Sequence, residues 1–207
     1  MNRVQVMLTA LVLAVFAMLG VGVVAFMHQQ TAPVISDKER EALGQRLAAV
    51  LPPGYDNDPA ADFLMLPPDP LLGGKGEAMV YVARKDGRVH GLAMKVVAPN
   101  GYSGAIHLLV GMDRDGRIGG VRVVSHKETP GLGDPIEEEK SDWIRVFGGR
   151  SLHDPEGKGW GVKKDGGAFD QFTGATITPR AVVRAVRDAL HYFERHRAQL
   201  LEEAGRP

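Results

Sequence analysis

Three threonines surround a pair of very small residues in the segment Asp170–Pro179, which reads DQFTGATITP and continues into a long amphipathic stretch. Because residues 174–175 are Gly and Ala, a bulky group can approach the backbone there. We expect Thr178 to cap the following helix and Pro179 to be its first residue. Thr176 would then lie beside the free N–H groups and the positive dipole end of that helix, a setting that favours a phosphate. A plain helix cap explains the same residues, since Thr-x-Thr-Pro is a common helix start.

A second segment, HKETPGLGD at residues 126–134, combines polar side chains with residues that prevent regular structure. Its proline and glycines would let the backbone come close to a flat ligand, although an ordinary Pro-Gly turn is the alternative. Residues 102–104 precede a neighbouring predicted strand and could line the same pocket. The positions that we expect to contact a ligand are His126, Glu128, Thr129, Gly131 and Leu132.

The centre of the chain is predicted to form a small antiparallel sheet. Two Asp-Gly pairs, at 86–87 and 115–116, each separate two apolar runs, and this pattern is typical of β-hairpins. Helices would have to cover at least one face of the sheet, so the expected fold class is α+β. The predicted strands are 79–84, 88–97, 106–112 and 117–125.

Two amphipathic helices flank this centre in the sequence. Ser36 and Glu39 form a capping box before a stripe of apolar residues that ends at Pro52, and residues 55–75 are expected to be an irregular connector. The last helix should run from Pro179 to about Glu203. Its apolar stripe consists of Val182, Val186, Leu190, Phe193 and Leu200.

The N-terminus contains an uncharged run, Val4–Met27, that is long enough to cross a membrane. A cleaved signal peptide is the alternative, but the apolar part of a signal peptide is shorter. Arg3 favours a cytoplasmic N-terminus, which would put the rest of the chain outside the membrane. The expected organisation is an anchor at 1–30, a capped helix and connector at 31–75, and a ligand-binding domain at 76–207.

The composition excludes several kinds of chemistry. Lys plus Arg and Asp plus Glu both number 25, so no net field favours nucleic acid, and the absence of cysteine excludes thiol chemistry and cysteine-bound clusters. Asp113 and Asp115 lack the further ligands of a calcium loop. His191 and His196 are five positions apart on a predicted helix and therefore cannot form a zinc pair, so no metal is expected.

The segment DQFTGAT matches the pattern D-x-x-(S/T)-G-A-T and resembles the flavinylation site of periplasmic FMN-binding domains. The resemblance implies that a flavin transferase, with FAD as donor, attaches FMN to Thr176 through a phosphoester, which makes this residue a phosphoryl threonine. HxETPGLG likewise resembles the flavin-facing loop of these domains. The residues that fill the flavinylation pattern are Asp170, Thr173, Gly174, Ala175 and Thr176.

The longer stretch from Gly101 to Phe147 is similar to the G subunit of the Rnf electron-transport complex, as are the chain length and the single N-terminal apolar run. This resemblance implies a single-pass flavoprotein of the bacterial inner membrane that has its soluble domain in the periplasm. It would be an electron carrier rather than an enzyme alone, in a complex that moves electrons between ferredoxin and NAD and couples them to ion transport. Its partners would be the other membrane and redox subunits. The alternatives are a component like the C subunit of the sodium-translocating NADH:quinone oxidoreductase, or a membrane-anchored binding module without redox function.

Overall fold

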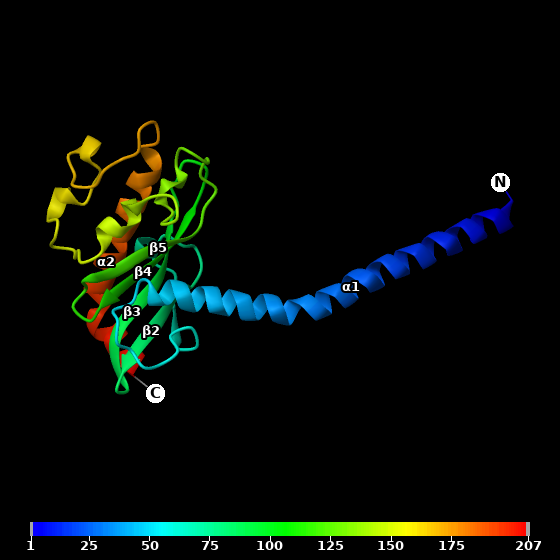
Figure 1. Cartoon of the computed structure of the whole chain (residues 1–207), viewed down its shortest axis with the longest axis horizontal. Helices are drawn as coiled ribbons and strands as arrows, with labels where there is room; N and C mark the ends of the chain where they lie inside the picture. The colour runs from blue at the N-terminus through cyan, green and yellow to red at the C-terminus, as the bar shows by residue number, and fades with distance from the viewer. Residues whose placement is uncertain (1, 206–207) are drawn as a thin grey trace. The chain divides into compact units, whose positions relative to one another are not determined.

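A computed structural model describes residues 2–205 of the chain, apart from the side chains at positions 33, 34 and 36. The chain forms two compact units, Met1–Ala42 and Leu43–Pro207. The fold is α+β, with a long N-terminal helix, a five-stranded sheet and a C-terminal helix (Figure 1). The main elements are α1 (Arg3–Ala48), β1 (Phe63–Leu66), β2 (Ala78–Lys85), β3 (Arg88–Ala98), β4 (Ile106–Asp113), β5 (Ile118–Ser125) and α2 (Ile177–Gly205).

Helix α1 begins with the apolar run and is long and apolar enough to cross a membrane. The large apolar side chains of this run, from Val4 to Met27, are exposed, as is expected of a lipid-facing segment. The prediction of a separate helix that starts at Ser36 is wrong, because α1 continues through this position to Ala48. Extending an existing helix adds one hydrogen bond per residue without a new nucleus, so the capping signal at Ser36 is overridden.

The sheet is an antiparallel meander in which each strand pairs with the next, in the order β1-β2-β3-β4-β5. The two predicted hairpins are confirmed. Asp86 and Gly87 form the two-residue turn between β2 and β3 with φ angles of 51° and 71°, the positive values that such a turn requires. Gly116, in the loop between β4 and β5, also has a positive φ, of 79°.

Strand β1 lies in the segment that was expected to be irregular. Its four residues, FLML, pair antiparallel with β2, from Phe63 opposite Tyr81 to Leu66 opposite Ala78. A 3-10 helix, η1 (Pro70–Leu72), follows and is capped by the Asp69 side chain. A short apolar run without polar alternation fits a strand and a helix segment equally well, which explains why β1 was missed.

Helix α2 covers one face of the sheet. Its apolar stripe, predicted from the sequence, is buried in the main core together with the side chains of β2, β3 and β4 that point to the same face. The short helix η3 (Asp142–Phe147) and the loops after it add aromatic residues to this core, in which the rings of Phe147, Trp160 and Phe169 pack against one another.

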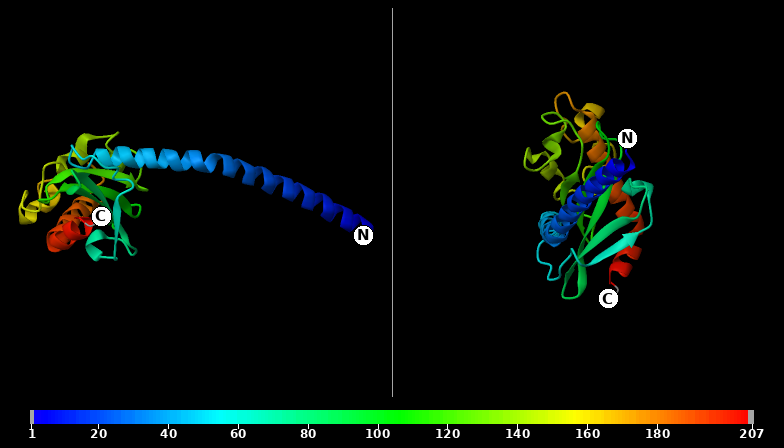
Figure 2. Two further views of the ribbon diagram at one scale, coloured as in Figure 1. Left: turned by 90° about the horizontal axis from the view of Figure 1, so that it is seen from below. Right: turned by 90° about the vertical axis from the view of Figure 1, so that its right-hand side faces the viewer.

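The end of α1 covers the opposite face of the sheet, so both faces are buried (Figure 2). Leu47, Val50 and Leu51 pack against Tyr81 and other side chains of this face. The backbone at the helix end lies so close to the strands that three positions of β4 and β5 have no room for a side chain. A Cβ atom would lie 2.1 Å from the Val50 carbonyl oxygen at Gly111, 2.4 Å from the same atom at Gly119, and 2.7 Å from the Ala49 carbonyl oxygen at Gly120.

The close contact between Gly111 and Val50 makes a testable prediction. Gly111→Ala should lower the free energy of unfolding by about 2–3 kcal/mol, because the new methyl group must push the helix end away from the sheet. Gly76→Ala is the matched control, since no atom lies within 4 Å of the added carbon there and the change should stay within about 0.5 kcal/mol. Urea unfolding of the full chain in detergent, followed by circular dichroism, measures both. Equal stability of the two variants would contradict the close packing.

Candidate functional site

Helix α2 begins two residues earlier than the sequence suggested. Thr178 was expected to be the N-cap and Pro179 the first helical residue, but the helix starts at Ile177. The carbonyl of Thr176 accepts the first intrahelical bond, from the N–H of Arg180 at 3.2 Å, so Thr176 occupies the capping position. Proline is tolerated in the first turn because the N–H that it lacks would have no intrahelical acceptor.

A cavity of about 220 Å³ lies at this helix start and brings together the two segments that the sequence singled out. One wall comes from the loop after β5, and the opposite wall from the Gly-Ala-Thr segment and the first residues of α2. The two walls approach closely, since a Cβ on Gly174 would lie 3.9 Å from the Leu132 Cδ2 atom. The lining residues are Tyr102, Glu128, Thr129, Leu132, Gly133, Gly174, Ala175, Thr176, Ile177 and Thr178.

The three threonines of this segment have different surroundings. Thr173 is exposed and does not line the cavity. Thr178 is buried, and its hydroxyl donates a short hydrogen bond to the Glu128 carboxylate. Thr176 is half-buried in the cavity wall, and its hydroxyl has no hydrogen-bond partner in the part of the chain that the structure describes. Thr176 therefore combines access to the cavity with an unused hydroxyl.

Glu128 connects the walls of the cavity. Its side chain is buried, with 4% of its surface exposed, and one carboxylate oxygen accepts the Ser103 N–H at 3.0 Å while the other accepts the Thr178 hydroxyl. Two glycines leave the space that this carboxylate occupies, because a Cβ on either Gly101 or Gly133 would lie 2.9 Å from one of its oxygens. The turn before β4, the loop after β5 and the start of α2 are thus joined at one side chain.

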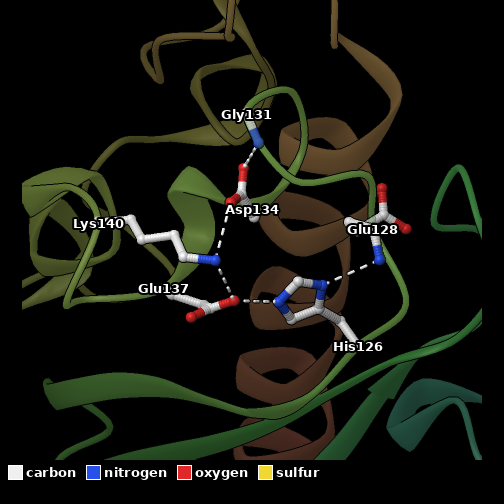
Figure 3. A network of polar contacts seen from close by, with 6 residues as sticks. All are labelled: His126, Glu128, Gly131, Asp134, Glu137 and Lys140. Carbon is white, nitrogen blue, oxygen red and sulfur yellow. Dashed lines mark hydrogen bonds and ion pairs between the residues drawn. The ribbon is translucent and has the colours of Figure 1, made fainter.

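A chain of polar contacts supports the 126–134 loop through His126, Asp134, Glu137 and Lys140, none of which lines the cavity (Figure 3). The Gly131 N–H donates to Asp134 at 2.6 Å, and Lys140 contacts both Asp134, at 2.8 Å, and Glu137, at 3.1 Å. Glu137 in turn contacts the His126 Nε2 atom at 2.6 Å. This network was not predicted from the sequence, because acidic residues next to a lysine usually form a solvated surface.

The same contacts determine the hydrogen positions on His126. Its Nδ1 atom accepts the backbone N–H of Glu128 at 3.0 Å, so the ring proton lies on Nε2 and is donated to Glu137. The pKa of Glu137 is lowered by this bond and by Lys140, and the pKa of Asp134 is lowered by its bond to Lys140 and by the Gly131 N–H. The ionised forms of both carboxyl groups therefore stabilise the folded loop.

The Gly-Ala-Thr segment is also supported from outside the cavity. The indole N–H of Trp143 donates to the Asp170 carbonyl oxygen at 2.8 Å, and the ring of Trp143 packs edge to face with Phe172. The Asp170 side chain is exposed and forms an ion pair with Lys163 at 2.5 Å. Asp170 is thus placed at the base of the threonine segment rather than in the cavity.

The predicted ligand contacts fall into two groups. Glu128, Thr129, Leu132, Gly174, Ala175 and Thr176 line the cavity, whereas His126, Gly131, Asp170 and Thr173 lie in its supporting segments. Gly131 has a positive φ of 78° and open space around it, so its backbone conformation rather than a close approach favours glycine. The sequence did not predict that Ile177 and Gly133 line the cavity. It also missed the contact of Thr178 with Glu128, because the Thr178 hydroxyl resembled that of a helix cap. Across residues 2–205 no group of acidic, histidine or cysteine side chains could hold a metal ion.

Comparison with known families agrees with this architecture. Residues 101–191 match the FMN-binding domain family, and residues 1–50 match the RnfG N-terminal region family. The fold and the two matches define the chain as a flavoprotein in which an FMN-binding domain follows a helix that is long and apolar enough to cross a membrane.

Relatives define the family more narrowly. The chain is 53% identical over 206 residues to the G subunit of the ion-translocating oxidoreductase complex of Pseudomonas aeruginosa, covering 98% of this chain and 96% of the relative. The G subunit of Vibrio cholerae is 45% identical over 92% of this chain and 91% of its own length, and that of Shewanella oneidensis is 44% identical over 93% and 92%. The chain belongs to the family of G subunits of ion-translocating oxidoreductase complexes.

The lowered pKa values of Asp134 and Glu137 predict how stability depends on pH. A carboxyl group with a lowered folded pKa stabilises the fold above its unfolded value, about 3.9 for Asp and 4.3 for Glu, and this contribution is lost as the pH falls through the folded value. Lys140→Met removes the cation that both groups contact, so the variant should be less stable than the parent at pH 5–7 and approach it below pH 4.

Urea unfolding of the full chain at a series of pH values measures this difference. Lys127→Met is the matched control, because Lys127 is exposed and lies in the supported loop without an ion pair among the described residues. Its effect should be small at every pH. A constant difference between the Lys140 variant and the parent down to pH 3 would contradict the assigned origin of the pKa shifts.

Proposed function

We propose that this chain carries FMN covalently, through a phosphoester to Thr176, and serves as a membrane-anchored electron carrier. The observation that carries the proposal is the position of the Thr176 hydroxyl, which makes no hydrogen bond to any described residue and lies at the α2 N-terminus in the wall of the cavity. The N–H groups and the dipole of this helix end favour the negative charge of a phosphate. Thr173 and Thr178 fit less well, because the first is outside the cavity and the second is bonded to Glu128.

The cavity suits a flavin that is tethered at one end and only partly enclosed. Its volume of about 220 Å³ is below the range of about 300–1,000 Å³ of pockets that bury most of a small molecule. Large apolar side chains extend beyond it at the surface, where Tyr102, Leu132 and Ile177 are 69%, 48% and 43% exposed. These side chains offer apolar surface to the part of a ring system that the cavity does not enclose.

FMN supplies the redox chemistry when it is bound, because a flavin can accept electrons one or two at a time. The protein holds the phosphate at the helix start and leaves room for it at Gly174 and Ala175. The supported loop from Glu128 to Gly133 shapes the opposite wall. A covalent link would keep the cofactor in place, which matters most where released FMN would be lost.

The family supplies the setting. The relatives are named as G subunits of ion-translocating oxidoreductase complexes, so we propose that this chain works with the other membrane and redox subunits of such a complex. The resemblance to Rnf complexes favours electron transfer between ferredoxin and NAD coupled to ion transport. A flavin transferase that uses FAD would attach the cofactor. The match to the FMN-binding domain family disfavours a membrane-anchored module without redox function. The relatives are all named as G subunits, which disfavours a component like the C subunit of the sodium-translocating enzyme.

Replacing Thr176 tests the attachment site directly. Thr176→Ala should give a folded protein without covalent flavin, because the hydroxyl makes no bond within the described chain and its loss should cost no more than about 0.5 kcal/mol. Thr173→Ala and Thr178→Ala are the matched controls and should both keep the flavin. The second should also lose about 1.5–3 kcal/mol of stability, because Glu128 loses a donor. Fluorescence of the denatured gel band and intact mass report attachment, and retained flavin in the Thr176 variant would disprove the assignment.

The proposed topology puts the N-terminus in the cytoplasm and the FMN-binding domain in the periplasm. A reporter that is active only in the periplasm, fused to the C-terminus, should therefore be active, and protease added to spheroplasts should digest the domain. A cytoplasmic reporter at the same position is the control. Protection of the domain until the membrane is broken would show the opposite orientation.

A further inference from the structure

The buried carboxylate of Glu128 differs from the other acidic groups around the site. Asp134 and Glu137 each contact Lys140, and the Asp170 side chain contacts Lys163. Glu128 is 4% exposed and lines the cavity, yet no lysine, arginine or histidine side chain between residues 2 and 205 forms an ion pair with it. In Figure 3 its carboxylate points away from the network that contains the nearby charged groups.

The groups that hold Glu128 stabilise a negative charge without cancelling it. The Ser103 N–H and the Thr178 hydroxyl are neutral dipoles, and both donate to the carboxylate. Neutral donors of this kind bind a carboxylate and leave its charge in place. A charge kept in this way acts strongly on its surroundings, because water screens it little.

We propose that Glu128 places a fixed negative charge in the cavity and thereby lowers the reduction potential of the bound flavin. The inference rests on the proposed function and adds an electrostatic role for one residue. With FMN bound, the flavin would gain one electron from a one-electron donor that loses it, and Glu128 itself would form and break no bond. The added electron is repelled by the Glu128 charge, so the reduced form is destabilised relative to the oxidised form. A low potential suits a carrier that must pass its electron on.

Glu128→Gln tests this role because the amide keeps the shape and an acceptor for the Ser103 N–H while it removes the charge. The flavin of the loaded, full-length protein in detergent should then become easier to reduce, by about a tenfold change in the one-electron equilibrium, which corresponds to about 59 mV. Glu139→Gln is the control. It also removes one carboxylate charge, but Glu139 is exposed, does not line the cavity and takes no part in the network that supports the 126–134 loop, so its shift should be several-fold smaller.

A second variant distinguishes an electrostatic role from a structural one. Thr178→Ala removes the hydrogen bond from the Thr178 hydroxyl to Glu128 but keeps the Glu128 charge. Because one donor that partly offsets the charge is lost, the reduction potential should fall rather than rise. If Glu128 only held the loops together, the two variants would shift the potential in the same direction. An unchanged or lowered potential in Glu128→Gln would overturn the inference. An unchanged potential is also the result expected if Glu128 carries no charge, because the glutamine variant would then match the parent.

Intact mass of each variant separates this inference from the proposed attachment. Flavin missing from the parent or bound at another residue contradicts the proposed function, whereas FMN on Thr176 with no shift in Glu128→Gln contradicts only the inference. If the glutamine variant is not loaded, free riboflavin is added to the unloaded parent and variant. The ratio of its affinities in the oxidised and reduced forms should then change about tenfold between the two proteins, and an equal ratio would overturn the inference.

Discussion

The carboxylate of Glu128 is the contact on which the geometry of the site depends. It joins Ser103, 25 residues before it, to Thr178, 50 residues after it. The cavity therefore exists only when the sheet, the loop after β5 and the start of α2 have all reached their places. No local segment could form such a site alone, because each contributes only one wall.

Both walls of the cavity are held in place by contacts on their outer sides. Lys140 and its two carboxylates fix the loop after β5, and the bond from Trp143 to Asp170 fixes the base of the threonine segment. A site that is arranged before its ligand arrives loses less entropy on binding. The glycines of both loops permit the backbone shapes, while side chains outside the cavity select one shape among those permitted.

The sequence predicted the parts of the structure that follow from local patterns. The Asp86-Gly87 pair, which can adopt the positive φ angles of a two-residue turn, made the first hairpin predictable, and the apolar stripe of α2 identified its buried face. β1 was not predictable, because its pairing with β2 and not its own sequence makes it a strand. The exact start of α2 was missed for a related reason, since the hydroxyl of Thr178 resembles a cap until its partner, 50 residues away, is known.

The close packing of Val50 against the glycines of β4 and β5 determines where the chain can be cut to prepare the flavin domain without its membrane segment. The folded unit begins at Leu43, inside α1, and Leu47, Val50 and Leu51 fill the second core. A truncated version that starts where the sheet starts would leave an apolar sheet face uncovered and would be prone to aggregate. The truncated chain should begin within α1, upstream of Leu43, so that the last turns of this helix still cover the sheet.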